Sequence, residues 1–148
     1  MQQAVSSRTP THLWVVGILS LLWNCFGAYD YLMTRMHNTA YLSRSGDPNA
    51  VLAWVASMPL YAQIGWGLGV WCGLLGAVLL LMRSRYAFWA FAVSLSGMAL
   101  SFTWQALATA APGAPNSAGM RMMMLSILLL GIGQAWYAWR QSESGLLR

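Results

Sequence analysis

Residues 60–85 read LYAQIGWGLGVWCGLLGAVLLLMRSR, and the 23 residues before Arg83 carry no charge. A helix needs about 20 predominantly apolar residues to cross the hydrocarbon core of a bilayer, which is roughly 30 Å thick. The stretch therefore predicts a transmembrane helix that ends at the turn formed by Arg83, Ser84 and Arg85.

Three further stretches have a similar length and composition and are bounded by charges, prolines or turn-forming residues. The four predicted spans cover about residues 13–33, 60–82, 86–111 and 120–139. The first could instead be a cleaved signal peptide, but Phe26 stands where a cleavage site requires a small residue. Little chain remains for a soluble domain, so we expect residues 1–148 to form one integral membrane domain, an all-α bundle of four transmembrane helices.

The composition excludes most other classes of protein. Of the 148 residues, 58% are hydrophobic and 7% are charged, against about 25% charged in soluble domains, and the mean hydropathy is +0.52. All eight basic residues are scattered arginines, so the chain has no basic run that could follow a nucleic acid. The lipid bilayer is therefore the expected partner, and nucleic acid is not.

The arginines also predict the orientation of the chain. Five lie on the side of the two termini and three on the opposite side. Because basic residues accumulate in cytoplasmic segments, we expect both termini in the cytoplasm, although a margin of two leaves room for insertion in both orientations. The groups are Arg8, Arg83, Arg85, Arg140 and Arg148 on the cytoplasmic side, and Arg35, Arg44 and Arg121 opposite.

The longest predicted loop, residues 34–59, contains a short amphipathic helix. Asp47 is a favourable N-cap, Pro48 suits the first helical position, and Pro59 ends the pattern. Apolar residues recur at helical spacing between them. We expect a periplasmic helix that lies along the membrane surface or caps the bundle.

Polar residues follow one face of the first span and extend past its lipid boundary. Spacings of three and four place them in one stripe on a helix. We therefore expect this helix to continue toward the last member of the set Asn24, Gly27, Tyr31, Thr34, Asn38 and Tyr41.

All four spans place a polar or indole side chain in the outer third of the bilayer. Since such groups are costly in lipid, they predict a pocket that opens to the periplasm and holds a cationic or hydroxyl-bearing ligand. The alternative is that Asp30 pairs with Arg35, His37 or a neighbouring glutamine, so that the polar groups only hold the helices together. The predicted ligand-binding residues are Asp30 as the charged anchor, Asn24, Tyr31, Gln63 and Gln105 as hydrogen-bond partners, and Trp66 and Trp104 as walls.

Small residues recur at close-packing distances on the second and third spans. Gly65, Gly69 and Gly73 form two consecutive G-x-x-x-G steps, and Gly97 belongs to a similar small face. Such spacing lets two helix backbones approach closely. We expect internal packing seams; the alternatives are a homodimer seam or a sliding contact.

The sequence shows no catalytic constellation. It lacks G-x-S-x-G, H-E-x-x-H and a phosphate-binding loop, so we expect neither an enzyme nor a cofactor. Thioethers and the imidazole of His37 on the outer side could bind Cu(I), but methionine is also an ordinary apolar packing residue, and we expect no metal site. The methionines concerned are Met33, Met36, Met58, Met120, Met122, Met123 and Met124.

The first span resembles a known family. It reads W-N-x-x-G-x-x-D-Y from Trp23 to Tyr31, followed by Thr34 and Tyr41-Leu42. This is similar to small four-helix inner-membrane proteins of Gram-negative bacteria that often carry a sugar-transporter label. The resemblance implies a bacterial inner-membrane location and a four-span architecture.

Two functional hypotheses follow. The first is a small-solute carrier or binding protein that uses the outer pocket. The second is a non-catalytic accessory or assembly subunit that docks to a larger membrane complex, or to a second copy, through its small-residue seams.

Overall fold

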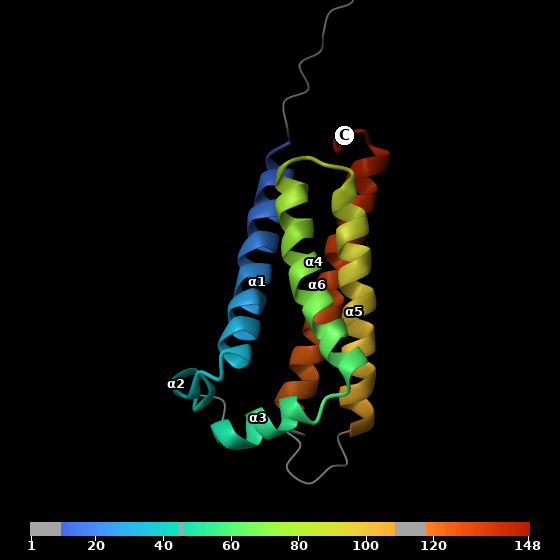
Figure 1. The fold of residues 1–148 in the computed structure, drawn as a ribbon. Coiled ribbons are helices and arrows are strands. Elements are labelled where there is room, and N and C mark those ends of the chain that lie inside the picture. Colours follow the sequence, from blue (N-terminus) through green and yellow to red (C-terminus); the bar gives the residue numbers. More distant parts are fainter. Residues whose placement is uncertain (1–9, 45, 109–117) are drawn as a thin grey trace, which may run out of the picture.

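The computed structural model describes residues 10–44, 46–108 and 118–148, and every regular element in these ranges is a helix (Figure 1). Four helices are each long and apolar enough to cross a membrane. The predicted all-α, four-span fold is therefore confirmed. These helices are α1 (Thr11–Arg35), α4 (Leu60–Leu81), α5 (Tyr86–Ala108) and α6 (Ala118–Glu143), whereas residues 109–111 of the predicted third span lie outside the described ranges.

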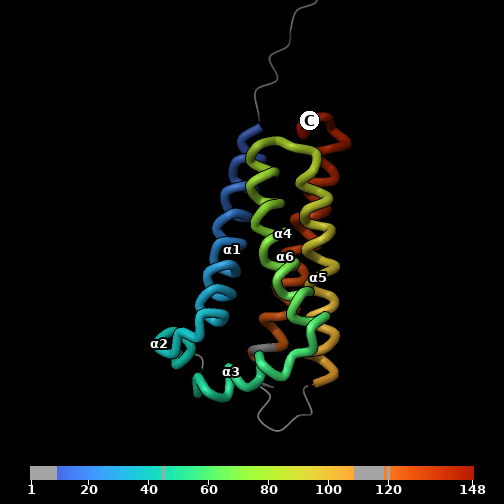
Figure 2. The backbone as a smooth tube through the Cα atoms, viewed as in Figure 1, coloured from blue at the N-terminus to red at the C-terminus, as the bar shows by residue number. Residues whose placement is uncertain are grey.

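The helices run antiparallel to their neighbours in the order α1, α4, α5, α6. The bundle thus has two distinct ends. We call one the terminal end, where α1 begins and α6 ends, and the other the loop end, where α2 (Thr39–Leu42) and α3 (Pro48–Ala56) lie (Figure 2). The most extensive interface is between α4 and α5.

The first helix ends earlier than its polar pattern predicted. His37 has a φ of 55°, and the Asn38 N–H donates to the Met33 carbonyl over 3.0 Å, which is the closing bond of a left-handed helix terminus. Asn38 then caps α2 by accepting from the Tyr41 N–H at 3.0 Å. The prediction that α1 continues toward Tyr41 is therefore wrong, because the chain reverses at His37.

The surface helix begins where its capping residues predicted. The Asp47 side chain accepts a hydrogen bond from the Asn49 N–H at 3.0 Å, and Pro48 opens α3. Figure 1 shows α3 lying across the loop end. The Trp54 ring packs on that of Trp104 in α5, with 4.8 Å between centroids, so α3 is tied to the bundle.

Glycines bring α4 and α5 into backbone contact. A Cβ placed on Gly65 would lie 2.6 Å from the Gly97 carbonyl oxygen, and a Cβ on Gly97 would lie 2.6 Å from the Gly65 oxygen. Nearby, the Ser94 hydroxyl donates to the Gly69 carbonyl over 2.5 Å. Gly73 is buried against Asn24 of α1. These four glycines therefore pack inside the bundle.

The hydrophobic core is concentrated toward the terminal end. There the last residues fold back, and the Arg148 N–H donates to the Arg83 carbonyl at 2.7 Å while the Arg85 N–H donates to the Arg148 carbonyl at 3.0 Å. The core residues are Leu13, Ala77, Leu80, Ala87, Phe91, Ala135, Ala138 and Leu147.

Candidate functional site

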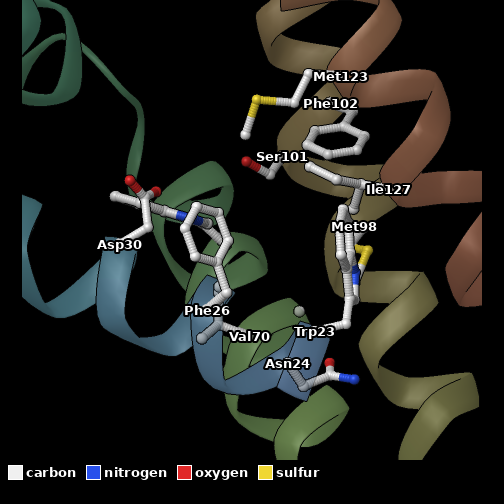
Figure 3. A pocket seen from close by; sticks show the side chains of 13 residues that line it. Trp23, Asn24, Phe26, Asp30, Val70, Met98, Ser101, Phe102, Met123 and Ile127 are labelled. Atoms are coloured by element: carbon white, nitrogen blue, oxygen red, sulfur yellow. The ribbon is translucent and has the colours of Figure 1, made fainter. Parts of the chain in front are cut away.

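A pocket of about 120 Å³ lies among the four long helices, between the hydrophobic core and the loop end (Figure 3). Its lining is mainly aromatic, aliphatic and thioether side chains, with one carboxylate. The lining residues are Trp23, Asn24, Phe26, Gly27 and Asp30 of α1, Trp66, Gly69 and Val70 of α4, Met98, Ser101 and Phe102 of α5, and Met123 and Ile127 of α6.

Two polar contacts link α1 to α6 on the side of the pocket that faces the terminal end. His12 Nδ1 and the Tyr137 hydroxyl lie 2.6 Å apart near the terminal end, and Asn24 Nδ2 donates to Gln134 Oε1 over 3.4 Å further along. One turn beyond Asn24, a Cβ placed on Gly27 would meet nothing within 4 Å. The missing side chain therefore leaves space beside α1.

Among the described lining residues, Asp30 provides the one acidic group of the pocket. The Tyr41 hydroxyl donates to Asp30 Oδ1 over 2.8 Å. Within the described ranges no other side chain donates to this carboxylate, and no arginine or histidine forms an ion pair with it. The alternative hypothesis, in which Asp30 pairs with Arg35, His37 or a glutamine, therefore does not hold.

Arg35 forms its hydrogen bond with Gln63 of α4 and not with Asp30. Its Nη1 donates to Gln63 Oε1 over 3.2 Å, and Gln63 Nε2 donates to the Met58 carbonyl over 2.9 Å. These contacts direct the guanidinium to the start of α4. The basic residue nearest to Asp30 in the sequence therefore does not form an ion pair with it.

Tyr41 reaches Asp30 because the chain reverses at His37. Its ring also packs edge-on against Tyr29, with 5.4 Å between centroids. Partial burial, together with the hydrogen bond to Asp30 and the negative charge of Asp30, raises the pKa of Tyr41 to about 12. Its hydroxyl therefore stays protonated and remains a donor to Asp30 at neutral pH.

Asn24 closes the pocket on the side of the hydrophobic core. It is buried, and Nδ2 donates to the Ser20 carbonyl over 2.8 Å as well as to Gln134. Both contacts pair the side-chain NH2 group of Asn24, which would be costly to leave without an acceptor in an apolar interior. Asn24 therefore connects α1 to α6 and forms a boundary of the site.

The structure brings three of the seven predicted ligand-binding residues to this pocket, namely Asp30, Asn24 and Trp66. The other four do not line it. Tyr31 packs its ring against Trp66 and Trp71, with centroid distances of 4.7 and 6.1 Å, and Gln63 binds Arg35 as described above. Their positions on the helices turn these side chains away from the site.

Trp104 and Gln105 also lie outside the pocket. Trp104 contacts Trp54 of α3, and Gln105 is buried with its Nε2 donating to the Ser101 hydroxyl over 3.2 Å. Ser101 itself lines the pocket. Gln105 therefore supports a lining residue from one helical turn away.

Most of the lining was missed because it consists of ordinary apolar residues. On α1, however, the spacing carries a usable signal. Trp23, Phe26, Gly27 and Asp30 recur at intervals of three, one and three, which places them on one helical face. The partners Met98, Phe102, Met123 and Ile127 on α5 and α6 could not be found in this way, because they are apolar residues among many others on those helices.

The methionines occupy separate environments. Met33 sulfur accepts a hydrogen bond from Asn38 Nδ2 at 3.7 Å, Met58 is buried, and Met123 lines the pocket. Across the part of the chain that the structure describes, no group of three or more histidine, cysteine, aspartate or glutamate side chains could hold a metal. Copper binding by the methionines and His37 stays an untested alternative.

Comparison of the chain with protein-family models, with curated proteins and with solved structures finds no match.

Proposed function

We propose that this protein binds a small amphiphilic solute in the pocket between α1 and α6 and acts as a non-catalytic carrier or binding protein. The observation that carries the proposal is a lone carboxylate, Asp30, at an apolar pocket, with one hydrogen-bond donor and no ion pair among the described residues. Ionisable groups within membrane spans are costly and tend to serve a function.

The pocket limits the size of the solute. Its volume is about 120 Å³, and an apolar cavity of about 150 Å³ in another protein admits benzene. A solute with one ring or a short alkyl chain therefore matches the site. A polar group on that solute would meet Asp30 while its body contacts the apolar walls.

The proposed location is a bacterial inner membrane with both termini in the cytoplasm. Two observations support it. Arg83, Arg85, Arg140 and Arg148 belong to the terminal end, in agreement with the enrichment of basic residues on the cytoplasmic side. The resemblance of the Trp23 to Tyr31 motif to inner-membrane proteins of Gram-negative bacteria is the second.

An accessory subunit or homodimer is the alternative. The glycines that would supply its docking seam are occupied inside the bundle. The face that could serve instead is that of α6, because a smaller share of its span is buried than in the other three spans. An accessory protein would dock there on a larger membrane complex.

Filling the pocket tests the proposal against this alternative. The protein is purified in mild detergent, its partners are identified, and thermal shifts are measured with benzylamine and benzyl alcohol. Ile127→Trp fills the pocket, whereas Leu129→Trp alters an exposed position of the same helix.

The proposal expects solitary protein or simple oligomers, a thermal shift with at least one compound, loss of that shift in Ile127→Trp and retention in Leu129→Trp. Stoichiometric foreign partners together with no shift would establish the accessory role. A shift that survives in Ile127→Trp would also overturn the proposal, because binding would then lie outside the pocket.

A further inference from the structure

We infer that the solute is a small lipophilic amine, bound in its protonated form with the ammonium group at Asp30. The inference rests on the proposed function, since it assigns a chemical class to the ligand of the same pocket. Three properties of the site lead to it: its charge, its aromatic walls and its exposure to the bilayer.

The one charged side chain among the described residues that line the pocket is the Asp30 carboxylate, which forms no ion pair with a described residue. Asp30 Oδ1 accepts from the Tyr41 hydroxyl, and no described residue donates to Oδ2. Among the residues that the structure describes, no arginine, lysine or histidine lines the pocket. An ammonium group would supply both the missing donor and the missing charge, whereas an alcohol would supply the donor alone. An anionic solute would be repelled.

The aromatic side chains that line the pocket also favour a cationic ligand. Four aromatic residues line the pocket, Trp23, Phe26, Trp66 and Phe102, together with the thioethers of Met98 and Met123. Aromatic faces attract cations, most strongly where water is excluded. In Figure 3 the Phe26 ring lies close to Asp30 on the α1 side, and the Phe102 ring lies across the pocket. The ammonium and the ring of one small molecule can thus both be accommodated.

The body of the solute must be lipophilic. Phe26 and Met123 line the pocket, yet 57% and 52% of their surfaces are exposed. Both lie within helices that are apolar enough to span a membrane. A solute between them therefore contacts acyl chains as well as protein, which favours an apolar ring or alkyl body.

Three compounds of nearly the same size and shape test the class of the solute. Benzylamine is a cation near neutral pH, benzyl alcohol is its uncharged counterpart, and benzoate is an anion. Binding to the detergent-solubilised full chain is measured by saturation-transfer NMR and by thermal shift. The variants are Asp30→Asn, which removes the charge but keeps an acceptor oxygen, and Tyr41→Phe, which removes the hydrogen bond from Tyr41 but keeps the charge.

We expect benzylamine to bind wild type about tenfold or more tightly than benzyl alcohol, as a charge-assisted hydrogen bond implies, and benzoate not to bind. Asp30→Asn should abolish the preference for the amine, and Tyr41→Phe should retain it. Glu143→Gln removes an exposed acid at the terminal end and should change nothing.

The outcomes separate this inference from the proposed function. If benzyl alcohol binds as tightly as benzylamine, or if Asp30→Asn keeps the preference, the amine assignment is wrong and the pocket remains a binding site. If none of the three compounds binds wild type, the proposed function fails with it.

Discussion

Tyr41 and Asp30 form the contact on which the electrostatics of the site depend. Tyr41 provides the one hydroxyl that approaches the carboxylate among the described residues, at 2.8 Å. It comes from α2, outside the spans, and reaches the site because the chain reverses at His37. A short extramembrane segment therefore stabilises a charge at the edge of the pocket.

Tyr41→Phe should lower the free energy of unfolding by about 1–2 kcal/mol near neutral pH, because a partly buried carboxylate loses its donor. The effect should depend on pH. The pKa of Tyr41 is raised from 10.0 to about 12 in the folded protein, so folding favours the protonated phenol. This stabilisation is complete below about pH 10 and is lost as the pH rises through about 12.

Thermal unfolding in detergent, from neutral pH to about pH 12, measures this difference between wild type and Tyr41→Phe. The control is Tyr29→Phe, because the Tyr29 ring packs on Tyr41 but its hydroxyl has no hydrogen-bond partner among the described residues. It should leave stability unchanged. A Tyr41→Phe variant as stable as wild type at neutral pH would show that the hydrogen bond does not stabilise the fold.

At the scale of elements, the α4–α5 interface depends on two glycines that let the backbones touch. A Cβ on Gly97 would lie 2.6 Å from the Gly65 oxygen and 2.8 Å from the Gly69 nitrogen. Both are backbone atoms, so the two helices would have to move apart. Gly97→Ala should therefore destabilise the bundle by about 1–3 kcal/mol.

Gly133→Ala is the matched control, since a Cβ at this position of α6 would meet nothing within 4 Å. There alanine should be neutral or stabilising by up to about 1 kcal/mol, because glycine is a poor helix former. Thermal or denaturant unfolding in detergent compares the two variants. Equal effects of the two substitutions would contradict the close α4–α5 contact.

The sequence predicted the boundaries of some helices better than those of others. The start of α3 follows from Asp47 and Pro48, because an N-cap acts within one turn. The end of α1 did not follow from its pattern, since the polar stripe remains in phase through Asn38 to Tyr41. A left-handed residue such as His37 interrupts a helix without a glycine or proline to mark it.

At the scale of the whole molecule, an even number of spans places both termini on one side of the membrane. Ser43, after α2, and Ser144, after α6, are both exposed, and each hydroxyl donates to a carbonyl three residues earlier. They are therefore a matched pair of labelling sites. Cysteine at either position, with Cys25 and Cys72 replaced by serine, reports the side on which it lies.

We expect Ser43→Cys to react with a membrane-impermeant maleimide in intact spheroplasts, and Ser144→Cys to react after the membrane is opened. The physical reason is the arginine excess at the terminal end, which favours the cytoplasm. The reverse pattern would place the termini outside. Labelling of both sites in intact spheroplasts would indicate insertion in both orientations.

The sequence by itself determined the number of spans, their limits to within a few residues and the position of the surface helix. Each of these depends on local length, hydropathy and capping, which the thickness of a bilayer and the first turn of a helix constrain directly. It also singled out Asp30 as the acid to examine, since the other two acids lie in α3's cap and in the last turn of α6.

Only the tertiary structure decided which side chains meet. Most positions of the long helices are apolar, so hydropathy alone does not define how each helix is rotated about its axis. That rotation turns Tyr31, Gln63 and Trp104 away from the pocket and Phe102 and Ile127 into it. The reversal at His37 then gives Asp30 a tyrosine as its partner, in place of the cation or amide of the alternative hypothesis, because Arg35 is bound to Gln63.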